Sequence, residues 1–85
     1  MPTISEFFGI YTQIMFLDHN PPHFHARYGN QKVIIEIESG IVKGEMSERA
    51  LRLIFEWKDL HKEELKQAWE KAKNGEQPNK IEPLK

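Results

Sequence analysis

The stretch from Glu48 to Lys73 constrains the fold most strongly, because it contains no glycine or proline and keeps one helical period throughout. Ser47 before it is a favourable N-cap residue, and Glu48 falls in the first turn, where the helix dipole favours negative charge. At about 100° per residue, the apolar side chains form one continuous stripe. The stripe comprises Ala50, Leu51, Ile54, Trp57, His61, Leu65, Ala68, Trp69 and Ala72. The pattern predicts one long amphipathic helix, with a break near Asp59 as the alternative.

A continuous helix over this stretch would be about 40 Å long, which is long for a chain of 85 residues. Asn74 and Gly75 supply a C-cap signal. Residues 75–85 are therefore expected to form an extended tail, with Ile81 and Leu84 docked on the body.

Three residues of the apolar stripe could also carry chemistry. Trp57 and Trp69 stand at helical spacing among aliphatic residues, so we expect them in the core or an interface. His61 lies near the centre of the stripe and should face the sheet. We expect a core histidine that makes one hydrogen bond; the alternative is a histidine that meets the loop histidines described below.

The first half of the chain carries strand patterns. Residues 7–17 are rich in aromatic and β-branched types and predict the first strand, with neither face clearly polar. Residues 23–28, 32–38 and 41–45 predict three more short strands, separated by turn signals. The predicted fold is therefore α+β: a mostly antiparallel meander sheet of about four strands packed on the long C-terminal helix, in a single domain over residues 1–85.

The pairing of the second and third predicted strands follows from parity. The apolar residues have even residue numbers before the turn and odd residue numbers after it. Paired residues must therefore sum to an odd number, which fits a loop of about two or about four residues. A two-residue loop sets His23 opposite Glu36, but also Arg27 opposite Lys32. A four-residue loop sets His25 opposite Glu36 and avoids this pair of like charges. Both registers place histidines and glutamates on the face away from the apolar one.

The densest group of reactive side chains is the segment Asp-His-Asn-Pro-Pro-His-Phe-His at residues 18–25. His23 and His25 point to one face of a strand, about 7 Å apart along the chain. That spacing suits two ligands of one metal ion, with Asp18, His19 or a glutamate completing the set. The chain has no cysteine, so the candidate metals are those that imidazole binds, such as zinc, nickel or copper. We expect at most a modest site, with the chain folding without metal.

Two other interpretations use the same segment. His23 and His25 are candidates for a general acid and base, with Arg27 binding an anion such as phosphate. The third interpretation is a polar sheet surface beside a loop, in which Asp18 caps backbone N–H groups. Glu36 is expected near Lys43, which would hold it in an ion pair.

Size and charge limit the class of protein. Lys and Arg total 12 and Asp and Glu total 13, for a formal net charge of −1, which argues against broad electrostatic capture of nucleic acid. No signal peptide or membrane-spanning run is evident, so we expect a cytoplasmic protein. A core this small is marginal alone. Self-association or a protein partner is therefore expected, as a first strand apolar on both faces also suggests.

Along nearly its whole length the sequence resembles the bacterial family called domain of unknown function 4160. The matching residues are Met1–Ser5, Phe7–Ile10, Asp18–His25, Ala50–Leu53, Glu56–Trp57, Leu60–His61, Glu63–Leu65, Trp69, Asn74–Gly75 and Lys80–Leu84.

The resemblance implies no activity and no catalytic residue. It implies a small protein encoded beside another small protein, in an arrangement similar to toxin–antitoxin pairs. We therefore expect a protein-interaction module of a two-gene system. The alternative is a small hydrolase, such as an RNA-cleaving toxin, in which nucleic acid is only a substrate and the 18–25 segment carries the chemistry.

Overall fold

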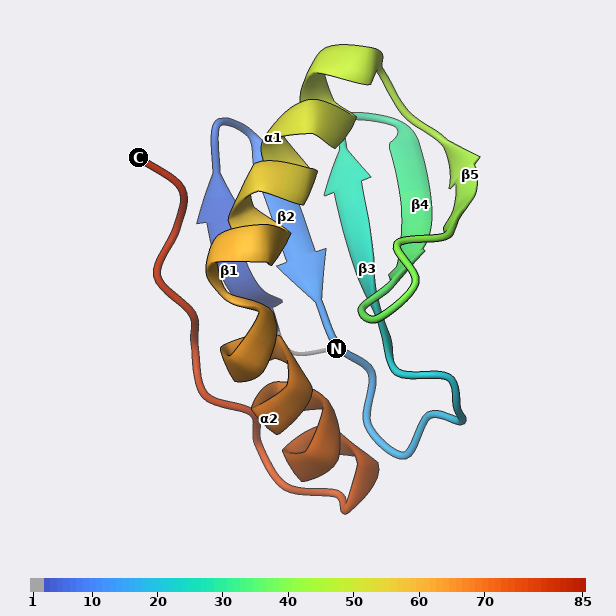
Figure 1. Ribbon diagram of the computed structural model, residues 1–85, viewed down its shortest axis with the longest axis vertical. Coiled ribbons are helices and arrows are strands. Elements are labelled where there is room, and N and C mark those ends of the chain that lie inside the picture. Colours follow the sequence, from blue (N-terminus) through green and yellow to red (C-terminus); the bar gives the residue numbers. More distant parts are fainter. Residues whose placement is uncertain (1–2) are drawn as a thin grey trace.

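The computed structural model describes residues 3–85, so Met1 and Pro2 of the expected domain lie outside the described part. Five strands form one antiparallel sheet in meander order (Figure 1). The strands are β1 (Thr3–Phe7), β2 (Ile10–Gln13), β3 (His23–Tyr28), β4 (Gln31–Glu36) and β5 (Val42–Glu45), followed by α1 (Glu48–Leu60) and α2 (Lys62–Lys73). The α+β class and the meander are as predicted. In the described residues no helix is long and apolar enough to cross a membrane.

The prediction of four strands is wrong, because residues 7–17 do not form a single strand. Phe8 and Gly9 reverse the chain with positive φ angles of 50° and 80°, and they separate β1 from β2. Positive φ at two consecutive positions is typical of the two-residue hairpin turn that matches strand twist. Residues 3–6, which were not predicted to be a strand, therefore join Phe7 in the edge strand β1.

The turn between β3 and β4 is the two-residue alternative. Gly29, with φ of 59°, and Asn30 connect the strands, so that His23 lies opposite Glu36 and Arg27 lies opposite Lys32. The register that avoids facing like charges is not the one adopted. Sheet pairing in this hairpin is set by the tight turn and the buried face, rather than by surface charge.

The prediction of one continuous helix is also wrong. The backbone at His61 leaves the helical region, with φ of −122° and ψ of 28°, and separates α1 from α2. The break lies two positions beyond Asp59, the alternative site. It allows α1 to lie across one face of the sheet while α2 lies beyond the end of the sheet, beside the connection from β2 to β3 (Figure 1). The N-cap prediction holds, since the Ser47 hydroxyl accepts a hydrogen bond from the Ala50 N–H at 3.2 Å.

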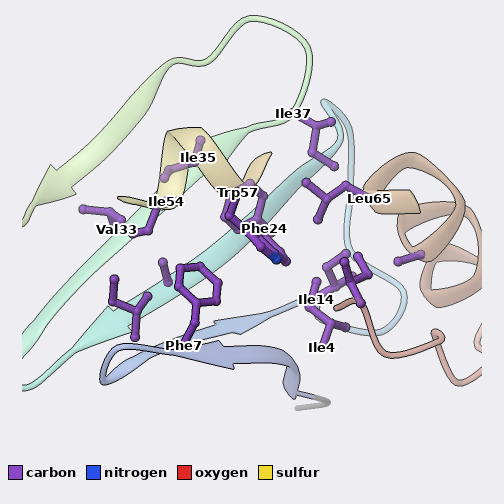
Figure 2. Close-up of a cluster of buried hydrophobic side chains, with 14 of the residues drawn as sticks. Ile4, Phe7, Ile14, Phe24, Val33, Ile35, Ile37, Ile54, Trp57 and Leu65 are labelled. Atoms are coloured by element: carbon purple, nitrogen blue, oxygen red, sulfur yellow. The ribbon is translucent and has the colours of Figure 1, made fainter. Parts of the chain in front are cut away.

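The core fills the space between the sheet and the helices (Figure 2). Trp57 of α1 is fully buried at its centre, with its ring 5.3 Å from that of Phe7 and 5.6 Å from that of Phe24. Burying a large apolar side chain contributes about 1.5–3 kcal/mol. Most of the predicted stripe is buried, and so are the three predicted strand residues Val33, Ile35 and Ile37. Both tryptophans are core residues, so neither one indicates an interface.

The C-terminal segment closes the core. Gly75 (φ 80°) ends α2: its N–H bonds to the Ala72 carbonyl, and the Glu76 N–H bonds to the Lys71 carbonyl, which is the paired bonding of a Schellman motif. The expected docking of Ile81 and Leu84 is confirmed, since both are buried.

The tail is also fixed by hydrogen bonds to two different elements. The Ile81 N–H donates to the Ile4 carbonyl at 2.8 Å, and the Trp57 indole N–H donates to the Glu82 carbonyl at 2.9 Å. The first bond joins the tail to the outer edge of β1, where strand backbone groups would otherwise be unpaired.

Candidate functional site

The connection from β2 to β3 is held at both ends by backbone hydrogen bonds. The Leu17 N–H donates to the Ala72 carbonyl at the end of α2, and the Ile37 N–H donates to the Pro22 carbonyl. Asp18 lies between these anchors, and its Oδ1 accepts the N–H of His19 at 2.9 Å. The loop therefore holds the Asp18 carboxylate over the start of β3.

His23 is fixed by partners on both ring nitrogens. Its Nδ1 lies 2.7 Å from the Pro21 carbonyl oxygen and its Nε2 lies 2.9 Å from Asp18 Oδ2. The ring is buried, with the Trp69 ring of α2 5.0 Å away. A carbonyl oxygen can only accept, so Nδ1 carries a proton. His23 thus presents Nε2 to Asp18 in one fixed orientation.

His25 follows two positions later on the same face of β3, with its ring 5.5 Å from that of His23. Its Nε2 lies 3.9 Å from Asp18 Oδ2, which is too long for a hydrogen bond. This nitrogen is buried and has no hydrogen-bond partner. Burial, and then the nearby His23, lower the pKa of His25 below its ordinary value of 6.5, so the neutral ring with a free lone pair is favoured at neutral pH.

Asp18 is held as a carboxylate. Partial burial raises its pKa, but the hydrogen bond from the His19 N–H, the contact with His23, and the positive charge that these histidines carry when protonated outweigh burial and lower the pKa below 3.8. At neutral pH the loop thus supplies a negative charge next to two imidazoles.

Three ligand atoms converge at this point. One carboxylate oxygen of Asp18 and one ring nitrogen from each of His23 and His25 lie within 4.8 Å of one another. These three residues, called here the Asp-His-His cluster, border a recess of about 300 Å³ that is also lined by Glu36 and Lys43. The geometry suits a divalent transition metal that keeps an open coordination position toward the recess.

The other candidates from the sequence lie around this cluster. The His19 side chain is 93% exposed, and its Nδ1 lies 3.1 Å from Asp18 Oδ1, whereas His23 contacts Oδ2. Arg27 lies on the same face of β3, and its guanidinium stacks over the Tyr11 ring at 5.2 Å from the ring centroid. Glu36 accepts the Ser39 hydroxyl at 2.7 Å. In the described chain Glu36 has no ion pair with Lys43, which differs from the expected contact.

His61 does not join the loop histidines. Its Nδ1 lies 2.7 Å from Glu64 Oε1, one turn along α2, and its ring lies 6.1 Å from that of Trp57. The expected single hydrogen bond is present, but the side chain is 17% exposed, so His61 lies at the edge of the core. Its position at the helix break accounts for this exposure.

Two contributors to the site were not assigned to it from the sequence. The Pro21 carbonyl orients His23, and Trp69 forms the wall behind it. Neither has a sequence signal of its own, because a backbone carbonyl is the same at every residue and Trp69 looks like any other member of the apolar stripe. Trp69 belongs to α2, the helix that follows the break and lies beside the loop.

Comparison with known proteins confirms the family resemblance over most of the chain. The family model described as "Domain of unknown function (DUF4160)" matches residues 9–70, which include the whole Asp-His-His cluster. The ends of the resemblance, residues 1–8 and 71–85, fall outside the match. No curated protein and no solved structure matches the chain.

Proposed function

The chain belongs to the family described as DUF4160, a description that assigns no activity, and we propose from the geometry of its site that it is a small metal-dependent hydrolase. The observation that carries the proposal is the convergence of Asp18, His23 and His25 within 4.8 Å. Two imidazoles and one carboxylate, with a further position open, are one of the donor sets found in catalytic zinc sites.

The hydrogen bonds of His23 favour a metal ligand over a purely structural histidine. Its Nδ1 proton is committed to the Pro21 carbonyl, while Nε2 faces the Asp18 carboxylate. A ring that carries only the Nδ1 proton would direct its Nε2 lone pair at a negative charge. A second proton on the ring would remove that repulsion, and so would a cation bound to both groups. Metal-bound histidines commonly donate their other N–H to a backbone carbonyl, as His23 does to Pro21.

His25 supports the same conclusion by a different route. A buried polar atom without a partner is unfavourable by about 1–3 kcal/mol, and Nε2 of His25 is such an atom. This atom lies 3.9 Å from Asp18 Oδ2. Coordination would satisfy it without any change of fold.

The chemistry follows from the open side of the cluster. A divalent metal held here would lower the pKa of a bound water molecule and polarise the bond to be cleaved. In the net reaction the oxygen of water bonds to the attacked centre, and the leaving group departs with a proton. The recess of about 300 Å³ provides room for that water and the reacting group. The same donor set also binds iron(II) for oxygen chemistry, so the identity of the metal in the isolated protein is part of the test.

The test begins with untagged protein purified without a metal-chelating column. Elemental analysis identifies any metal, and calorimetric titration of zinc into metal-free protein measures affinity for the wild type, His25→Ala and His61→Ala. We expect stoichiometric zinc binding by the wild type and by His61→Ala, and a large loss for His25→Ala. Zinc-loaded protein should then hydrolyse an activated ester or phosphodiester.

If the protein does not bind zinc at about 50 μM, a concentration at which even weak binding is detected, the histidines have only a hydrogen-bonding role. Zinc binding without turnover would leave a metal-binding module and reject the hydrolase. If the isolated protein contains iron, the proposed reaction becomes oxygen chemistry and hydrolysis is rejected.

A second candidate function is a protein-interaction module of a two-gene, toxin–antitoxin-like system. It is supported by Leu17, which is 73% exposed although its φ is 54°. A left-handed conformation costs a non-glycine residue about 1–2 kcal/mol. An exposed leucine held there, beside the exposed Phe16, offers an apolar contact next to the site loop.

Size measurement and a matched variant test the interaction. Light scattering at micromolar concentration should show a dimer or a complex with the neighbouring gene product. Leu17→Asn, which retains the backbone geometry that asparagine tolerates, should abolish the association while Leu60→Asn should not. A strict monomer that does not bind the neighbouring gene product counts against this function.

A further inference from the structure

A second concave surface adjoins the Asp-His-His cluster on the face of the sheet opposite the helices. It has a volume of about 450 Å³, and it is lined by side chains of β2 to β5. His25 borders both this surface and the recess of the cluster. A ligand lying here would therefore reach His25 directly.

Three cationic side chains line this surface. In the sheet register Arg27 lies opposite Lys32. Lys43 lies in the neighbouring row, opposite Ile34, which separates it from His25. Within residues 3–85 the lysine ion pairs involve Lys58, Lys62 and Lys66. Arg27, Lys32 and Lys43 have no carboxylate within 4 Å there. No carboxylate lines this surface, although Glu45 lies opposite Lys32 at the edge.

The position of Arg27 opposite Lys32 is unfavourable for the free protein. Like charges directly across a strand pair destabilise a sheet by a few tenths of a kcal/mol to about 1 kcal/mol. An anion bound between them would reverse that repulsion. Stacking of the guanidinium on Tyr11 holds Arg27 along the sheet. Its N–H donors remain free for a ligand, since no side-chain hydrogen bond of Arg27 occurs in the part of the chain described.

Between the cations and the cluster the surface is apolar. Met15 follows β2, and Ile34 lies between His25 and Lys43 in the register. Both side chains are half-buried and form part of the lining. The surface thus combines a cationic part, an apolar part and a volume within the range of about 300–1,000 Å³ that small-molecule sites occupy.

We propose that this surface binds an organic phosphate, with the phosphoryl group at Arg27, Lys32 and Lys43 and the organic part on Met15 and Ile34. The inference that an organic phosphate is the substrate of the metal-dependent reaction rests on the proposed function. The inference that this surface binds an organic phosphate does not. Arginine recognises phosphate through paired N–H donors, and lysine adds point charge. The phosphoryl group could belong to a free small ester or to one linkage of an oligonucleotide.

The test uses chemical-shift titrations of the metal-free, full-length protein at low ionic strength. The probes are adenosine 5′-monophosphate, uncharged adenosine, inorganic phosphate and a single-stranded hexauridylate. We expect the monophosphate to shift amide signals of β3, β4 and β5, and adenosine to leave them unchanged. Raising the salt concentration should weaken the monophosphate effect. Tighter binding of hexauridylate than of the monophosphate would identify an oligonucleotide as the source, and the reverse would identify a free ester.

Variants separate the anion site from the metal site. Arg27→Met should weaken monophosphate binding by roughly tenfold or more while zinc affinity is retained. His23→Ala should lose zinc and still bind the monophosphate. Arg52→Met removes an exposed arginine of α1, on the other face of the sheet, and should match the wild type.

Two results would overturn the proposal. One is the absence of localised shifts at about 10 mM monophosphate, a concentration that would detect even very weak binding. The other is equal monophosphate binding by wild type and Arg27→Met. If the wild type binds the monophosphate but not zinc, the proposed function is rejected and the anion site is retained.

Discussion

His23 Nε2 lies 2.9 Å from Asp18 Oδ2, and this contact joins the β2–β3 loop to the first residue of β3. The pair has two possible roles, an ion pair with a doubly protonated ring or two ligands of one metal. These roles respond differently to substitution and to pH, and the structure allows each response to be predicted.

Asp18→Asn replaces a charged oxygen donor by a neutral amide. We expect the affinity for zinc to fall by at least roughly tenfold, because the site loses its only negative ligand. Zinc titration by calorimetry measures the change. Asp59→Asn is the matched control, since Asp59 is 77% exposed on α1 and does not line the recess; an equal loss in both variants would contradict the assignment of Asp18.

Acid should destabilise the metal-free protein, beginning near pH 6.5. The pKa of His25 is lowered by burial, so the unfolded chain takes up a proton at a higher pH than the folded protein does. Stability therefore falls as pH drops below 6.5, by at most about 1.4 kcal/mol per pH unit for this one group. Asp18, whose pKa is lowered below 3.8, adds a loss of stability only at lower pH, as the folded carboxylate becomes protonated.

Urea unfolding at several pH values between about 7.5 and 5 measures this dependence. His25→Gln should remove much of the loss, and His19→Gln should retain it, because His19 is 93% exposed. Identical pH profiles for His25→Gln and the wild type would show that His25 is not the group responsible. Zinc affinity should fall over the same pH range, because protons compete for the ligand nitrogens.

Gly44→Ala should destabilise β5 strongly. A Cβ at this position would lie 2.6 Å from the Lys32 carbonyl oxygen, and the φ of 107° is strained for any other residue. We expect a loss of about 2–3 kcal/mol in the free energy of unfolding. Gly29→Ala is the control: its φ is 59°, but nothing lies within 4 Å of the added Cβ. Its loss should be about 1 kcal/mol, and equal losses at both sites would mean that the close approach at Gly44 is relieved.

Ile81→Ala tests whether the tail is part of the core. Ile81 is buried and its N–H bonds to the Ile4 carbonyl. Removing a buried isoleucine side chain costs about 2–5 kcal/mol. Ile41→Ala is the control. Ile41 is 52% exposed, so this substitution should change the free energy of unfolding by less than about 0.5 kcal/mol. Thermal or urea unfolding measures both, and a neutral Ile81→Ala would show that the tail adds no stability.

Local sequence was sufficient for much of the fold. The helical period from Ala50 to Ala72 identified most of the helix side chains that are buried, because each residue adds a fixed rotation, but it did not identify the buried Lys58. Parity around Gly29 limited the β3–β4 register to two alternatives and predicted that His23 and His25 would share a face. These conclusions depend only on the geometry of single elements and on short turns.

Tertiary structure decided the rest. The break at His61 has no glycine or proline to announce it, and it lets α2 contact the β2–β3 loop through the Leu17–Ala72 hydrogen bond and the His23–Trp69 ring contact. The same packing places Trp69 behind His23 and positions Asp18 over His25. A register chosen by charge would have kept Arg27 and Lys32 apart. The tight turn and the buried face set the register instead, and the two residues lie opposite each other. Sequence determined which groups were available, and long-range packing determined which of them meet, since the distance between residues far apart in the chain is fixed only when the core closes.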